Sequence, residues 1–311
     1  MIAQVLPIRP RLHDTPALSR HLWGIVLAGT APETSAITGA RVAHRQLGRR
    51  LTRFARDVRP VLFRRAVERA SRLIAPRRLV AVLSRADIGD YAPELVDLPA
   101  IEFVTQPVYR GSAAEIFLPV LKIAHQDPHA VIVVLPSDQL VDYEARFMNY
   151  VSRAVAAVTV RPDLPLVIGA RPPGPDPSST WIEAGDTVDG LESFAVREVK
   201  RFVDRPSLAE AEALYESDGL LSTLVIIATA RRLLELGRRY LPDVLETLEP
   251  LESAFGTPEE DLLCEAVYEG MPSASISRDL LERGGAFGVL PIPDVVWRDH
   301  AHPARVTALA S

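Results

Sequence analysis

A single carboxylate follows the most apolar stretch of the chain. Residues 131–135 are all apolar, which indicates a strand buried on both faces of a mostly parallel sheet. Pro136 has no N–H to donate, so strand pairing should stop there, and Asp138 comes just beyond that end. Ligands of open α/β sheets bind at this edge, where a carboxylate can hold a divalent metal against a phosphate. The alternative is that Asp138 caps the next helix or turn.

Other polar segments lie between the apolar runs before and after residues 131–138. His21 begins a strand that leads into a turn at Gly29. A Gln-Pro-Val-Tyr-Arg-Gly-Ser-Ala-Ala-Glu run covers residues 106–115, ahead of a helix-like segment. Downstream, a Trp-Ile-Glu-Ala-Gly segment (181–185), an Arg-Phe-Val-Asp-Arg-Pro segment (201–206) and a Val-Trp-Arg-Asp segment (296–299) follow in that order.

The order and spacing of these segments resemble those of the sugar-1-phosphate nucleotidyltransferases, most closely the mannose-1-phosphate guanylyltransferase branch. The resemblance extends over nearly the whole chain after about residue 20, and its most specific parts are Leu-Pro-Ser-Asp at 135–138 and Arg-Gly-Ser-Ala-Ala at 110–114. It implies an α/β, Rossmann-like fold of the glycosyltransferase-A type, with a mixed, mostly parallel central sheet flanked by helices. The implied reaction joins a sugar-1-phosphate to a nucleoside triphosphate, GTP with mannose-1-phosphate, and releases pyrophosphate with Mg²⁺ as the cofactor.

The resemblance also assigns roles to individual residues. Asp138 and Asp299 match the two aspartates that hold the metal. Arg41 and Arg205 would offset charge on the phosphates during catalysis. The residues implied in nucleotide binding are Ala28, Gly29, Thr30, Arg110, Gly111, Ser112 and Ala113. The residues implied in sugar binding are Glu183, Ser222 and Thr223.

The chain departs from the family pattern around the phosphates. Family members carry a glycine-rich loop after the first strand and then a Pro-Lys pair, whereas here Gly29 is the one glycine at the start of that loop and Glu33 adds a negative charge. Glycines let backbone N–H groups turn toward a phosphate without a Cβ clash. Only Lys122 and Lys200 are lysines among 35 basic residues, and Arg205 stands where the family has a lysine. Arginine keeps the charge but grips phosphate with a two-pronged geometry.

Two other motifs differ at ligand-facing positions. Leu221, Ser222 and Thr223 replace the Trp-Asn-Ser of the family, so the amide that would bond sugar hydroxyls is lost. Asp299 is kept, but the glycine that the family carries two residues after this aspartate is replaced, and His300 and His302 stand on either side of that position. Two histidines two residues apart share one face of an extended segment, but no third ligand lies nearby, and we interpret them as loop residues near the sugar pocket.

These departures leave two classes of function open. One is an active nucleotidyltransferase, favoured by both metal aspartates. The other is a non-catalytic relative that binds a nucleotide or nucleotide-sugar as a regulator or partner subunit, favoured by the altered loop and the missing lysines. A sugar-transferring enzyme of the same fold is a third option by fold analogy alone.

The composition of the chain bears on its binding partners and its cellular location. The net charge of −5 gives no basic footprint for nucleic acid, and no segment reaches the roughly 20 apolar residues of a membrane span. Residues 1–20 lack a continuous apolar core, so we expect no signal peptide and a cytoplasmic protein. Cys264 is the only cysteine and should lie in the core. The sequence leaves a homo-oligomer open.

Periodicity and turn residues predict the organisation. We expect a loose leader over residues 1–20 and a single nucleotidyltransferase-like domain over residues 21–311. Predicted strands are 25–28, 79–83, 101–105, 131–135, 166–168, 194–204, 221–228, 286–292 and 295–297, with the last two closing the sheet. Predicted helices are 61–74, 113–125, 147–158, 207–217, 231–240 and 258–268, where Ser207 and Thr257 serve as N-caps. Residues 171–180 are rich in Pro, Gly and Ser and predict a loop that could act as a lid.

Overall fold

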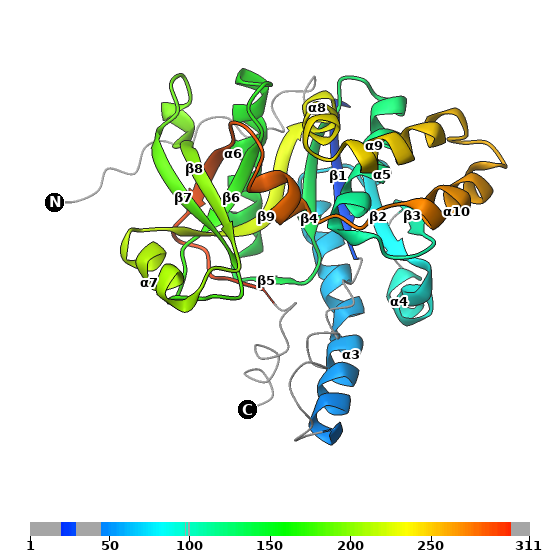
Figure 1. Cartoon of the computed structure of the whole chain (residues 1–311), viewed down its shortest axis with the longest axis horizontal. Coiled ribbons are helices and arrows are strands. Elements are labelled where there is room, and N and C mark those ends of the chain that lie inside the picture. Colours follow the sequence, from blue (N-terminus) through cyan, green and yellow to red (C-terminus); the bar gives the residue numbers. More distant parts are fainter. Residues whose placement is uncertain (1–19, 29–44, 97, 99, 300–311) are drawn as a thin grey trace.

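A nine-stranded sheet forms the centre of the molecule (Figure 1). The computed structural model describes residues 20–28, 45–96, 98 and 100–299, with the backbone alone for residues 45–57 and 299. The predicted leader and the histidines at 300 and 302 lie outside this part. In spatial order the strands are β3 (Glu102–Gln106), β2 (Leu79–Ser84), β1 (Leu22–Leu27), β4 (Val131–Pro136), β9 (Leu220–Thr229), β6 (Leu166–Ala170), β10 (Gly288–Ile292), β8 (Arg197–Asp204) and β7 (Thr180–Thr187).

Most strands run in one direction. β1 is parallel to β2 and β4, β2 is parallel to β3, and β6 is parallel to β10. β9 is antiparallel to both β4 and β6, so β6 and β10 run the same way as β1 to β4. β7 pairs with β9 as well as with β8, which closes the strands from β9 to β7 into a ring. Among the described strands this closure leaves β3 as the open edge of the sheet.

Helices cover both faces of the sheet. One core cluster joins α3 (Arg45–Ala70) and α6 (Glu144–Val160) to the sheet, and the other joins α5 (Gly111–Gln126), α8 (Ala230–Tyr240), α9 (Pro242–Leu248) and α10 (Glu260–Gly270). Alternate residues of β4 enter the two clusters: Val133 packs in the first, and Ile132 and Val134 pack in the second. The predicted α/β fold, with a strand buried on both faces at residues 131–135, is therefore confirmed.

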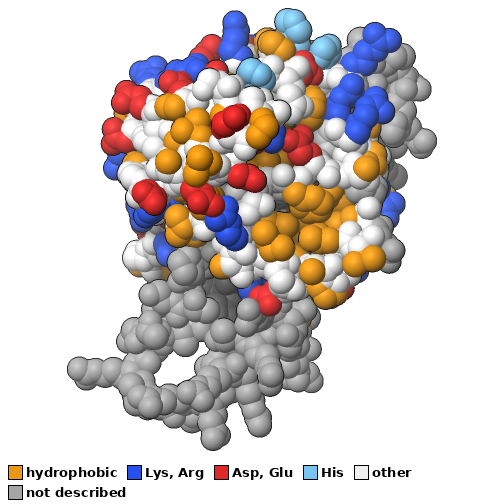
Figure 2. Space-filling model, turned by 90° about the vertical axis from the view of Figure 1, so that its right-hand side faces the viewer, with side chains coloured by type: hydrophobic (Ala, Val, Ile, Leu, Met, Phe, Trp, Pro, Cys, Tyr) orange, Lys and Arg blue, Asp and Glu red, His pale blue; other side chains and the backbone are white. Residues whose placement is uncertain are grey.

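The open-edge side of the sheet exposes apolar side chains. Ile88 in α4 (Ile88–Leu95), Phe103 in β3 and Leu262 in α10 are all at least 37% exposed. Figure 2 shows this side of the molecule, with hydrophobic side chains gathered among charged ones. No helix in the described part of the chain is both long enough and apolar enough to cross a membrane.

Local signals located most elements within a few residues. Ser207 caps α7 (Leu208–Glu216) as expected, and its Oγ accepts a hydrogen bond from the Glu210 N–H at 3.2 Å. Thr257 does not cap α10, because that helix starts at Glu260 and Glu259 is its N-cap residue. Cys264 is buried as predicted, and this burial raises the pKa of its thiol to about 11.

The final strand is the main error in the predicted sheet. Residues 295–297 were expected to close the main sheet, but β11 (Trp297–Asp299) pairs only with β5 (Gln139–Val141), in a separate two-stranded ribbon. The sequence analysis predicted neither β5 nor β7. β5 has three residues, and a strand that short gives too few positions for a periodicity to be recognised.

Candidate active site

The parallel strands β1 and β4 end side by side. Leu27 of β1 lies opposite Pro136 of β4, and the Ser137 N–H donates to the Leu27 carbonyl at 3.0 Å. Ala28 and Asp138 therefore both lie at the carboxyl edge of the sheet, the edge predicted to bind ligands. The N-cap residue of the next helix is Tyr143, so Asp138 is not that cap.

The β5–β11 ribbon brings the two predicted metal aspartates together. The ribbon is antiparallel, and its register places Asp299 opposite Gln139, the residue that directly follows Asp138. Directly opposed residues of an antiparallel pair have Cα atoms about 4.5–5.5 Å apart. The backbones of Asp138 and Asp299, far apart in sequence, are therefore close together beyond the carboxyl end of β4. Mg²⁺ sites in proteins use one or two carboxylates together with substrate phosphates, so this donor set fits that ion.

Asp138 borders a buried phenol. The Tyr91 hydroxyl donates to the Ala28 carbonyl at 3.1 Å, and Tyr91 is 1% exposed. Burial raises the pKa of Tyr91, and the neighbouring carboxylates of Asp87, Asp138 and Glu115 raise it further. The hydroxyl therefore stays protonated and holds the end of β1. Gly29, Thr30 and Arg41, which the resemblance placed in this region, lie outside the described residues.

The Arg-Gly-Ser-Ala loop at the start of α5 is bonded to the end of α10 and to the chain segment that follows it. The Arg110 guanidinium donates to the Tyr268 carbonyl at 2.9 Å and to the Glu269 carbonyl at 3.0 Å. Ser112 Oγ accepts from the Ile276 N–H at 3.0 Å. The side-chain groups of Arg110 and Ser112 that the resemblance assigned to nucleotide binding thus have partners within the chain.

Backbone contacts complete this packing. The Ala113 N–H donates to the Ala274 carbonyl at 3.1 Å, and the Ala274 N–H donates to the Arg110 carbonyl at 3.2 Å. Gly111 has a φ of +86°, and a Cβ there would overlap the Ala274 carbonyl oxygen. The glycine of this loop is therefore required by the close approach of two backbones.

Ser222 and Thr223 lie in an irregular part of β9. Thr223 Oγ1 donates to the Ile168 carbonyl at 2.9 Å and accepts from the Val225 N–H at 3.2 Å, while Ser222 Oγ accepts from the Leu224 N–H at 3.3 Å. Leu224, which follows Thr223, has a φ of +54°, and the register of β9 with β6 shifts here. Both hydroxyls stabilise this irregular segment of β9, the strand that pairs with β4.

Gln139, the first residue of β5, links this part of β9 to the segment that follows β4. It is 5% exposed, and its Nε2 donates to the Thr223 carbonyl. Its Oε1 is buried and has no hydrogen-bond partner in the described part of the chain. Sequence reasoning missed Gln139, and its position directly after Asp138 was the one signal for it.

Glu183 and Arg205 belong to the β7–β8 hairpin. The Glu183 carboxylate accepts from Arg201 Nε at 2.8 Å, and this bond lowers the pKa of Glu183. Arg201 also pairs with Glu210 at 3.3 Å. Arg205 directly follows β8 and has a φ of +52°.

A chain of contacts connects Asp138 with Arg205. Gln139, next to Asp138, is bonded to Thr223 of β9. Leu221 of the same strand lies opposite Trp181 of β7. Just before β7, the Ser179 carbonyl accepts a hydrogen bond from the Arg205 N–H at 3.3 Å. The structure thus places Ala28, Asp138 and Asp299 at the carboxyl ends of β1 and β4, the buried Ser222 and Thr223 in the neighbouring part of β9, and Arg205 at the end of β8.

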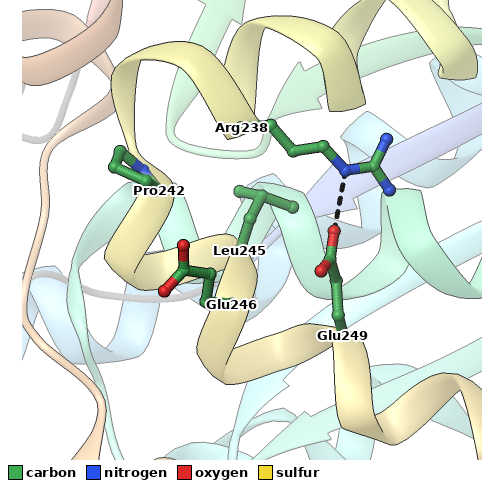
Figure 3. A pocket seen from close by; sticks show the side chains of 5 residues that line it. All are labelled: Arg238, Pro242, Leu245, Glu246 and Glu249. Atoms are coloured by element: carbon green, nitrogen blue, oxygen red, sulfur yellow. Dashed lines mark hydrogen bonds and ion pairs between the residues drawn. The ribbon is translucent and has the colours of Figure 1, made fainter.

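A small surface pocket lies elsewhere, between α8 and α9 (Figure 3). It has a volume of about 220 Å³, and Arg238 and Glu249 on its wall form an ion pair at 2.7 Å. None of the residues predicted from sequence lines it. In the described residues, no group of three or more His, Cys, Asp and Glu side chains forms a metal cluster.

The curated proteins similar to this chain have names that refer to sugar-nucleotide or polysaccharide synthesis. A mannose-1-phosphate guanylyltransferase of Escherichia coli is 25% identical over 201 residues. The mannose-1-phosphate guanylyltransferase ManC of Salmonella typhimurium is 27% identical over 201 residues, and the xanthan biosynthesis protein XanB of Xanthomonas campestris is 27% identical over 197 residues. These matches cover 63%, 63% and 62% of this chain. The chain spans only 42%, 41% and 40% of those relatives, and no family model matches it.

Solved structures share the fold over most of the chain. A protein named mannose-1-phosphate geranyltransferase, from Thermus thermophilus, aligns with a TM-score of 0.71 at 22% identity, over 90% of this chain and 76% of that one. A protein named mannose-6-phosphate isomerase, from Helicobacter pylori, aligns with a TM-score of 0.65 at 16% identity, over 90% of this chain and 100% of that one. At these identities the likeness confirms the predicted fold class.

Proposed function

We propose that this chain, which belongs with the sugar-1-phosphate nucleotidyltransferases, joins a sugar-1-phosphate to a nucleoside triphosphate and releases pyrophosphate. The observation that carries the proposal is the register of the β5–β11 ribbon, which sets Asp299 beside the residue that follows Asp138. A buried strand would not need two acidic residues from distant segments at its carboxyl end. A reaction that gathers a triphosphate and a metal there does need them.

The chemistry requires positioning and charge neutralisation more than a protein nucleophile. A phosphate oxygen of the sugar-1-phosphate attacks the α-phosphorus, the bond from that phosphorus to the bridging oxygen breaks, and pyrophosphate leaves with the electron pair. Asp138 and Asp299 would hold Mg²⁺, which supplies positive charge to the triphosphate when bound. Arg205, together with Arg41, would offset charge on the phosphates and fix their orientation.

The relatives suggest which substrates to propose, and the two groups of predicted site residues suggest where each substrate would bind. The relatives named mannose-1-phosphate guanylyltransferase favour GTP and mannose-1-phosphate as the substrate pair. The nucleotide would lie at the carboxyl ends of β1 and β4, against Ala28, Gly29, Thr30 and the loop from Arg110 to Ala113. The sugar would lie on the side of Glu183, Ser222 and Thr223.

Pyrophosphate release tests the proposal. Purified protein, Mg²⁺, GTP and mannose-1-phosphate should release pyrophosphate only when both substrates are present. Asp138→Asn should lower the rate by at least about 100-fold, because one anionic metal ligand is lost while the side-chain volume is kept. The matched control is Asp186→Asn, an exposed aspartate at the far end of β7, which should keep the parent rate.

The alternative is a non-catalytic relative that binds a nucleotide or nucleotide-sugar as a regulator or partner subunit. The bonds that join Arg110 to the end of α10 and Ser112 to the segment after it favour this alternative, because those groups are already engaged within the chain. A panel of triphosphates and sugar phosphates that gives no pyrophosphate, while calorimetry still detects nucleotide binding, would replace the enzyme by this binding protein. A rate that is unchanged in Asp138→Asn would remove that residue from the metal site.

A further inference from the structure

Arg205 has a backbone conformation that an arginine seldom adopts. Its φ of +52° lies in the left-handed region, where the Cβ of an L-residue crowds the backbone and glycine is preferred. Residues in this conformation persist when the surrounding structure holds them there, and they gather at functional sites. Arg205 is exposed, so no buried packing of its side chain accounts for the strain.

Three hydrogen bonds hold the corner formed by Asp204 and Arg205. The Asp204 N–H donates to Glu282 Oε1 at 2.6 Å, and Thr180 Oγ1 donates to Asp204 Oδ1 at 2.7 Å. The Arg205 N–H donates to the Ser179 carbonyl at 3.3 Å. Glu282 comes from a segment remote in sequence, directly after the π-helix Ile276–Leu281 that packs against β8. The corner is therefore set from two sides.

The loop that supplies Ser179 is itself fixed. The Asp176 carboxylate accepts from the Ser178 N–H at 2.9 Å, from Ser178 Oγ at 2.6 Å and from Ser179 Oγ at 2.7 Å. The Asp176 carbonyl accepts from Trp181 Nε1 at 2.7 Å, and Trp181 is fully buried. Within the predicted loop at residues 171–180, the part from Asp176 to Ser179 is thus held by hydrogen bonds where it contacts Arg205.

The geometry points to a role for Glu282 that nothing in the sequence suggested. We propose that Glu282 is a positioning residue: its carboxylate fixes the Asp204–Arg205 backbone so that the guanidinium can bind the phosphate of the sugar-1-phosphate. This inference rests on the proposed function. A guanidinium binds a phosphate dianion through two parallel N–H bonds, an arrangement sensitive to where the side chain starts. The φ of Arg205 determines where its side chain leaves the backbone, and the bond from the Asp204 N–H to Glu282 fixes this backbone conformation.

Glu282→Ala and Glu282→Gln separate this role from general packing. The alanine variant loses the acceptor for the Asp204 N–H, so KM for mannose-1-phosphate should rise about tenfold while KM for GTP stays unchanged. Glutamine keeps a carbonyl oxygen at the same place and should restore the parent value. Glu212→Ala, an exposed glutamate on α7, is the control for removing a surface charge. Thermal unfolding of each variant checks that the fold is kept.

A double-mutant cycle asks whether Glu282 acts through Arg205. If it does, Glu282→Ala added to Arg205→Ala should cause no further rise in KM for mannose-1-phosphate. Additive effects, equal rises in both KM values, or a parent-like Glu282→Ala variant would each overturn the inference.

Binding measurements keep this test separate from the test of turnover. If the parent protein releases no pyrophosphate, the proposed reaction fails, and calorimetry with mannose-1-phosphate then takes the place of KM. Weaker binding in Glu282→Ala with parent-like binding in Glu282→Gln would still support the positioning role. A parent protein that binds no mannose-1-phosphate would overturn it.

Discussion

The two sides of the candidate site use their polar residues differently. On the side of β1 to β3, Arg110 and Ser112 bond to the chain's own backbone, and the glycine between them allows two backbones to touch. On the side of β7 and β8, Glu183 and Arg201 form an exposed ion pair, and Arg205 stays exposed at a strained corner. One side is therefore built mainly for stability, and the other keeps charged groups accessible to a ligand.

The largest difference in stability should come from Gly111. An alanine there meets the Ala274 carbonyl oxygen and keeps a φ of +86°, so Gly111→Ala should lower the free energy of unfolding by about 3 kcal/mol or more. Gly190→Ala is the matched control, because Gly190 has a φ of +80° with open space around it and should lose only about 1 kcal/mol. Denaturant titration measures both. Equal losses would mean that the contact between α5 and the segment at Ala274 contributes nothing.

Replacing Arg110 should lower the free energy of unfolding more than replacing Arg201, and the difference should be smaller than the one between the two glycines. Arg110→Ala removes two bonds to carbonyls at the end of α10 and should lower the free energy of unfolding by about 1–2 kcal/mol. Arg201→Ala removes an exposed pair and should cost less than about 1 kcal/mol. If Arg201→Ala proved the more destabilising of the two, the assignment of stability to one side and ligand access to the other would be wrong.

The smallest effect should be the pH dependence of the Glu183–Arg201 pair. The hydrogen bond from Arg201 lowers the pKa of Glu183 in the folded protein below its unfolded value. The stabilisation is therefore present above the unfolded pKa and is lost as pH falls through the folded one. The two side chains are 34% and 52% exposed, so solvent screening limits the contribution to a few tenths of a kcal/mol.

Glu183→Gln tests this dependence by denaturant titration. The variant should be slightly less stable than the parent at about pH 7, and the difference should disappear as pH falls through the lowered pKa of Glu183, where the parent side chain also becomes neutral. Sodium chloride at about 1 M, where the screening length is about 3 Å, should also remove the difference. A difference that persists at low pH would point to packing rather than charge.

Local sequence signals recovered the elements that depend on local rules. The apolar run at residues 131–135 became β4, and Ser207 became the cap of α7 through its bond to the Glu210 N–H. β5 and β11 followed no such rule. Each has three residues, and each is a strand because the other lies beside it. Sequence could not supply that pairing, since hydrogen bonds between distant segments depend on how the chain folds between them.

The sequence by itself determined that a carboxylate follows a fully buried strand, and its order of motifs determined the family resemblance. Only the tertiary structure decided that Asp299 lies beside the residue after Asp138, that Arg110 and Ser112 bond within the chain, and that Glu282 holds the backbone before Arg205. The physical reason is the range of the interactions. Burial periodicity and capping act between near neighbours, whereas the partner of a polar group is whatever the fold brings within about 3 Å of it.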